Sequence, residues 1–122
     1  MTGLIHFINQ FNGWGMPALR LAIAIVFVVH GVPKVKNPAG IASAYGAPKF
    51  VGLLHGLVEV LGAVALVAGY QRRQAALLLA VIMLGAIYFK KFKWKIPFWA
   101  RDNTGWEFDL VLLGGLLAIL LG

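Results

Sequence analysis

The chain of 122 residues contains no cysteine, and only four of its residues are aspartate or glutamate. The absence of cysteine excludes a disulfide scaffold, a thiol enzyme and any cysteine-bound metal or cluster. Charged residues make up 12% of the chain, about half the share in a soluble domain, whereas hydrophobic residues make up 61%. This balance excludes a disordered chain and argues against an ordinary soluble domain. It predicts a single membrane domain over residues 1–122.

Four apolar runs predict an all-α fold, a bundle of four transmembrane helices. The runs cover residues 17–32, 50–70, 74–89 and 106–122. A run of sixteen residues reaches only about 24 Å, against a hydrocarbon core of about 30 Å, so three of the four spans are expected to be short. Residues 71–73 predict a tight turn of a helical hairpin, and residues 33–49 predict an irregular loop. Residues 1–15 favour a short interfacial helix before the first span.

The net charge of +7 predicts the orientation of the chain in a membrane. Eight basic residues lie in the two long connections: Lys34, Lys36, Lys49, Lys90, Lys91, Lys93, Lys95 and Arg101. The positive-inside rule then places both long loops in the cytoplasm and both termini outside, as in a multi-pass protein of the plasma membrane. The expected partner of these charges is a bilayer with anionic headgroups. The alternation of lysine and aromatic residues over 90–103 favours an interfacial belt over a nucleic-acid site.

Ionisable residues within the spans are the candidate ligand-binding or intramembrane polar cluster, because such groups are costly in lipid. They are Arg20, His30, His55, Glu59, Glu107 and Asp109. Glu59 lies roughly 13 Å and Arg20 roughly 18 Å from the cytoplasmic ends of their predicted helices. A long arginine side chain spans this difference, which predicts an Arg20–Glu59 ion pair in the middle of the membrane.

Several of these residues also have a purely structural interpretation. Thr104 and Glu107 match a capping box at the start of the fourth span. His30 precedes Gly31 and Pro33 in the sequence and is expected to close the first helix. His55 is equally well explained as a hydrogen-bonded filler or as a functional group. Glu107 and Asp109 point about 200° apart on a helix, so at most one of them faces an interior cluster.

Two further patterns are less specific. Gly52 and Gly56 form a G-x-x-x-G motif, which favours close helix packing within the bundle or between protomers. His30 and His55 lie at similar depth on neighbouring helices, as the axial ligands of a haem do. Nothing else in the sequence supports haem, and no metal site is predicted.

The order of these motifs resembles that of the DoxX family of small four-helix membrane proteins. The residues that carry the resemblance are Leu19–Leu21, Phe27, His30, Gly31, Lys34, Glu59–Gly62, Leu66, Gly69 and Gly105–Glu107. The resemblance implies a transmembrane four-helix bundle whose family-like polar residues are Arg20, His30, Glu59 and Glu107. Relatives in that family include a subunit of thiosulfate:quinone oxidoreductase, and others are linked to thiol and oxidative-stress systems.

Two functions remain open on these grounds. The first is a membrane subunit or partner of a redox system, whose bundle binds a quinone-type apolar ligand near His55 or Glu107. The alternative is a noncatalytic structural or assembly component, in which the charged layer sets helix register. Either function predicts a homo-oligomer or partner membrane subunits rather than a stand-alone enzyme. A small transporter is disfavoured because the sequence has no inverted repeat.

Overall fold

The computed structural model describes residues 2–101 and 104–122, and within these ranges the chain contains helices and no strand. The helices are α1 (Thr2–Asn9), α2 (Gly15–Lys36), α3 (Pro38–Ala44), α4 (Lys49–Ala68), α5 (Arg72–Tyr88) and α6 (Trp106–Leu121), with a π-helical turn, η1 (Phe89–Lys93), after α5. The predicted all-α fold is confirmed, and so is a helix before the first span. The end of the lysine–aromatic stretch, Asp102 and Asn103, lies outside the described residues, as does Met1.

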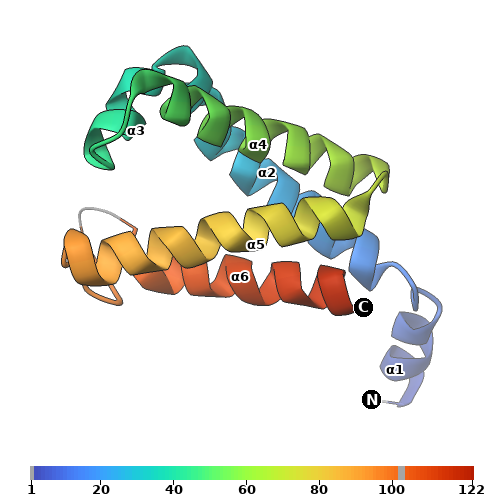
Figure 1. The fold of residues 1–122 in the computed structure, drawn as a ribbon. Helices are drawn as coiled ribbons and strands as arrows, with labels where there is room; N and C mark the ends of the chain where they lie inside the picture. The colour runs from blue at the N-terminus through green and yellow to red at the C-terminus, as the bar shows by residue number, and fades with distance from the viewer. Residues whose placement is uncertain (1, 102–103) are drawn as a thin grey trace.

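The bundle consists of two helix pairs (Figure 1). Helix α2 packs mainly against α4, and α5 packs mainly against α6, while α4 also contacts α5. The short helix α3 lies against α4 at one end of the molecule. Both termini lie at the other end, where α1 projects away from the bundle and buries none of its residues. The long connections therefore share one end of the bundle, and the termini share the other.

Three helical segments are long and apolar enough to cross a membrane: Gly15–Lys36, Lys49–Ala68 and Arg72–Lys93. At 22 residues, α2 reaches about 33 Å, enough for a whole hydrocarbon core. The expectation of three short spans is therefore wrong for the first and third. Helix α2 runs past His30 instead of ending there, and η1 lengthens α5. Only α6, with 16 residues, stays near 24 Å.

The connection between α2 and α4 is mostly helical, so the predicted irregular loop over 33–49 is wrong. Pro33 lies inside the last turn of α2 without ending it, since the helix continues to Lys36. Pro38 begins α3, because its fixed φ suits the first position of a helix.

The hairpin between α4 and α5 is confirmed, but its turn comes earlier than predicted. Gly69 and Gln71 adopt left-handed conformations, and Arg72 already begins α5.

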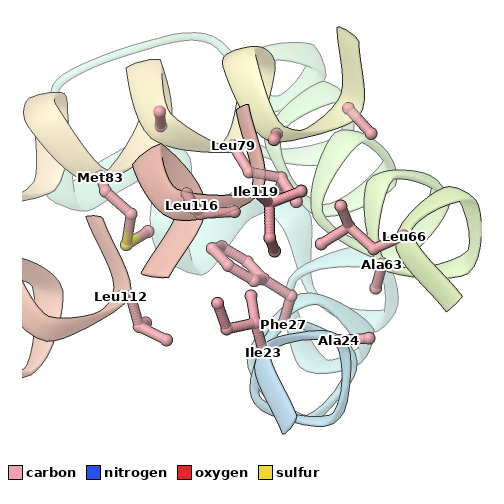
Figure 2. Packing of buried hydrophobic residues seen from close by; sticks show 13 residues of the cluster. Ile23, Ala24, Phe27, Ala63, Leu66, Leu79, Met83, Leu112, Leu116 and Ile119 are labelled. Atoms are coloured by element: carbon pink, nitrogen blue, oxygen red, sulfur yellow. The ribbon is translucent and has the colours of Figure 1, made fainter. Parts of the chain in front are cut away.

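The core lies between the two helix pairs, and the ring of Phe27 packs among its aliphatic side chains (Figure 2). Phe27 of α2 is 1% exposed, and fully buried leucines from α4, α5 and α6 complete the cluster: Leu66, Leu79 and Leu116. Within lipid, such packing stabilises a bundle by van der Waals contact rather than by removal of apolar surface from water. The core ends toward α3 at Phe27, Met83 and Leu112, and a cavity begins there.

The G-x-x-x-G motif packs within the chain. A Cβ atom on Gly52 would overlap the backbone oxygen of Pro38 in α3. A Cβ atom on Gly56 would lie 2.9 Å from both the Cβ of Lys34 and the backbone nitrogen of Val35 in α2. The two glycines therefore allow α4 to approach α3 and α2, which decides between the two interpretations of the motif in favour of the bundle interior.

Candidate functional site

A cavity of about 130 Å³ lies between the two helix pairs, next to the core. Its apolar wall is the end of the core, including Phe27, Met83 and Leu112. Its polar wall carries two histidines, two lysines and two carboxylates: His30, His55, Lys34, Lys90, Glu59 and Asp109. So many ionisable groups around one small cavity are typical of a functional site rather than of a structural core.

The first charged cluster joins α2 and α4. Glu59 is 1% exposed, and its Oε1 accepts a hydrogen bond from the Nζ of Lys34. The same oxygen lies 2.7 Å from the Nε2 of His55, one helical turn away on α4. A carboxylate removed from solvent in this way needs partners of this kind. The cluster therefore holds Lys34 and His55 at the cavity wall.

The second charged cluster joins η1 to α6. Lys90 donates a hydrogen bond of 2.7 Å from its Nζ to the Oγ1 of Thr104. The same Nζ lies 2.7 Å from the Oδ2 of Asp109, which is 3% exposed. The contact is an ion pair, and Oδ2 accepts no hydrogen bond from any described residue. Asp109 thus retains an acceptor oxygen at the cavity.

Aromatic side chains close the cavity between α3 and η1. The ring of Tyr45 stacks on the rings of His55 and Trp94, with 5.6 Å between ring centroids in each pair. It meets the ring of Phe89 edge-on. Trp94 donates a hydrogen bond of 3.3 Å from its Nε1 to the carbonyl oxygen of Ala44. These contacts connect α3 to η1. A π-helical turn such as η1 is rare and occurs often at functional sites.

The hydroxyl of Tyr45 remains protonated over the physiological range. Burial, together with the negative charges of Glu59 and Asp109, raises the pKa of Tyr45 to about 12. The phenol is therefore a neutral group that can donate a hydrogen bond beside the two charged clusters.

The predicted Arg20–Glu59 pair is wrong. Within the described residues, the ion-pair partners of Glu59 are Lys34 and His55. Helices α2 and α4 pack so that Gly31 lies opposite Glu59 and Arg20 lies opposite Gly69, at the far end of α4. The eleven residues from Arg20 to Gly31 correspond to about 16 Å along the helix, more than the arginine side chain spans. Arg20 therefore lies outside the cavity.

The remaining predicted residues separate into two groups. His30, His55, Glu59 and Asp109 line the one cavity, whereas Glu107 is not among its described lining residues. His30 meets the ring of Phe108 edge-on at 5.3 Å, and it does not end α2. The predicted capping box is also wrong. Helix α6 begins after Gly105 without a side-chain cap, and the hydroxyl of Thr104 bonds to Lys90 instead.

Sequence reasoning placed Lys34 and Lys90 among the charges that set orientation, and it did not single out Tyr45. Both lysines in fact reach inward to buried carboxylates. The sequence did contain a sign that Lys34 faces the site, because Lys34 lies one helical turn after His30 and therefore on the same face of the helix. Lys90 had no comparable signal, since its partner Asp109 is on another helix.

The cavity combines groups that can donate to, and accept from, a small polar ring. Its lysines and His55 present N–H donors, and its carboxylates are acceptors that can exchange protons with them. The described residues contain no group of three or more His, Asp or Glu side chains arranged to hold a metal ion. The site therefore suits hydrogen bonding and proton exchange with an organic ligand.

Comparison with known proteins places the chain in a family. The DoxX family model matches residues 15–91. The chain is 31% identical over 102 residues to a Bacillus subtilis protein named "Putative oxidoreductase CatD", covering 81% of this chain and 72% of that protein. It is 31% identical over 87 residues to a Haemophilus influenzae protein named "Uncharacterized protein", covering 67% of this chain and 63% of that protein. No solved structure matches the chain.

The family match spans α2, α3, α4 and α5, which carry His30, Lys34, Tyr45, His55 and Glu59 of the cavity wall. It ends just after Lys90, so α6 and Asp109 lie beyond it. The three long apolar helices agree with a membrane protein. Because the family model matches residues 15–91, more than half of the chain, the chain belongs to the DoxX family of membrane proteins.

Proposed function

We propose that this protein is a membrane subunit or partner of a redox system and that its cavity binds the ring of a quinone-type ligand. One observation carries the proposal, namely that two lysine–carboxylate clusters from opposite helix pairs line a single small cavity. A quinone ring has carbonyl oxygens that accept hydrogen bonds, and Lys34, Lys90 and His55 are donors at the wall. The name of the Bacillus subtilis relative supports a redox role.

The size and lining of the cavity support a single flat ring. Its volume of about 130 Å³ is close to that of an engineered cavity of about 150 Å³ that holds benzene. Tyr45 and Phe108 provide aromatic surface on two sides of it. We assign the electron donor or acceptor to a partner subunit, since a chain without cysteine has no thiol relay of its own.

Replacing Lys34 with methionine tests the proposal. We expect Lys34→Met to weaken binding of a tail-less dimethoxy-methyl-benzoquinone by roughly tenfold or more, because the ring loses a charged donor. The matched control is Lys36→Met, two residues along the same helix, where the side chain is exposed and does not line the cavity. Equilibrium dialysis of the detergent-purified protein, with the quinone quantified by its ultraviolet absorption, measures both constants.

Two outcomes would contradict this proposal. The wild-type protein could bind no ring, or Lys36→Met could weaken binding as strongly as Lys34→Met.

Purification in a mild detergent, with an absorption spectrum of the eluate, tests the alternative function, a noncatalytic assembly component, in the same preparation. A stable partner without quinone would favour an assembly role. Neutralising Lys91, Lys93 and Lys95, which are exposed, would then be expected to release that partner.

We also propose that the end of the bundle formed by α3 and η1 faces the cytoplasm of a plasma-membrane protein. Exposed basic residues gather at this end and suit anionic headgroups: Lys36, Lys49, Lys91, Lys93, Lys95 and Arg101. Because the chain has no cysteine, single cysteines report orientation without background. In intact cells, we expect a membrane-impermeant maleimide to label Thr2→Cys and to leave Lys95→Cys unlabelled. The reverse pattern would overturn this orientation.

A further inference from the structure

A second hollow, of about 400 Å³, lies on the outer surface between α4 and α5. Its own lining is apolar and includes Val51, Gly85 and Phe89. Three further residues, Tyr45, His55 and Ile82, line both this groove and the polar cavity. The groove therefore adjoins the cavity, and the stacked rings of Tyr45 and His55 and the side chain of Ile82 form the wall between them.

We propose that the groove between α4 and α5 holds the hydrocarbon tail of the ligand whose ring occupies the cavity, and that such ligands enter sideways from the bilayer. The inference rests on the proposed function. The cavity has room for one ring only, so a tail attached to that ring must leave past the cavity wall. The groove lies directly behind that wall, on the surface of two helices that are apolar enough to span a membrane. Lipid chains and a ligand tail are chemically equivalent there, so the groove selects by shape.

Another hollow adjoins the cavity, between α2 and α3, but it does not suit a hydrocarbon tail. It is lined by Lys34 and Asn37 as well as by Pro33 and His30. The groove, by contrast, has no lysine or asparagine among its described lining residues. A tail in the hollow between α2 and α3 would lie against the polar side chains of Lys34 and Asn37, so the groove is the better path.

Gly85 keeps the groove open. A Cβ atom at this position would meet nothing within 4 Å. The glycine is thus not required by helix packing, in contrast to Gly56, where a Cβ would meet α2. A larger side chain at position 85 would project into the groove without disturbing the bundle. This makes Gly85 the position from which the path can be blocked selectively.

The experiment compares decylubiquinone with its tail-less ring, dimethoxy-methyl-benzoquinone, as ligands of the detergent-purified protein. We expect Gly85→Leu to weaken binding of the tailed quinone by at least about tenfold, because its side chain occupies the path of the tail. Binding of the tail-less ring is expected to stay unchanged. The matched control is Gly114→Leu on α6, where a Cβ also meets nothing within 4 Å and which lies outside the groove. Val51→Phe provides a second block from α4.

The outcomes separate this inference from the proposed function. Selective loss of the tailed quinone in Gly85→Leu or in Val51→Phe supports the groove as the tail site. If Gly85→Leu and Val51→Phe bind the tailed and the tail-less quinone as the wild type does, the inference fails while the ring site stands. The same holds if these variants lose affinity for the two quinones equally. If the wild type binds neither quinone, the proposed function fails. Gly114→Leu behaving like Gly85→Leu would also overturn the inference.

Discussion

Replacing Glu59 with leucine is expected to lower the free energy of unfolding by about 3 kcal/mol, because it leaves two donors without their anion. Glu59 is 1% exposed and is the shared acceptor of Lys34 and His55. The expected value lies at the low end for a broken buried pair, since the side chain of Lys34 is 22% exposed and can turn toward water. Reversible unfolding of the detergent-purified protein measures the change.

The double variant Glu59→Leu/Lys34→Met separates the charge effect from simple loss of contacts. Removing both charges is expected to restore more than half of the lost stability, since no unpaired ammonium remains. The matched control is Glu107→Leu on α6, where the carboxylate is partly exposed and has no described ion-pair partner. If Glu107→Leu destabilised the protein as much as Glu59→Leu, or if the double variant were no more stable than the single one, the cluster would not have the role assigned to it.

Replacing Gly56 with leucine is expected to cost about 3 kcal/mol, because it forces α2 and α4 apart. A Cβ atom at position 56 would already lie 2.9 Å from the Cβ of Lys34 and from the backbone nitrogen of Val35. A backbone atom cannot move aside as the end of a flexible side chain can. The displacement would also carry Lys34 away from Glu59, so ring binding should fall together with stability.

Gly114→Leu is the control for this substitution as well. It adds the same side chain to another apolar helix, but its Cβ meets nothing within 4 Å. Thermal unfolding in detergent should therefore show a lower midpoint for Gly56→Leu and little change for Gly114→Leu. Equal midpoints for the two variants would mean that close approach of α2 and α4 at Gly56 does not stabilise the bundle.

The helices could be predicted from the sequence more reliably than their ends. Each long apolar run is incompatible with a water-exposed loop, so its presence indicated a helix regardless of tertiary context. The ends depended on residues whose local preference is weak or ambiguous. Pro33 lies in the last turn of α2 although proline commonly ends helices. Thr104 had the sequence of a helix cap, but its hydroxyl bonds to Lys90 from a neighbouring element.

The buried acids of the site were predictable, but their partners were not. Glu59 and Asp109 were singled out because carboxylates are scarce and costly within a membrane span. The formation of an ion pair depends on the register in which two helices pack, which decides which residues of one helix lie opposite which residues of the other. The predicted partner of Glu59 was Arg20, on the assumption that the first helix ends near Val32. The helix continues to Lys36, and the packed register brings Lys34 to Glu59 instead.

The sequence by itself determined that this is an all-α membrane protein, because its apolar runs have no polar face for water. It also determined that a few ionisable groups would lie inside the bundle, since they occur within those runs. Only the tertiary structure decided which cations meet the carboxylates, and that Glu59 and Asp109 line the same cavity. The physical reason is that an ion pair or a cavity depends on the separation and register of packed helices. These are decided by contacts such as that of Gly56 with α2, between residues far apart in the chain.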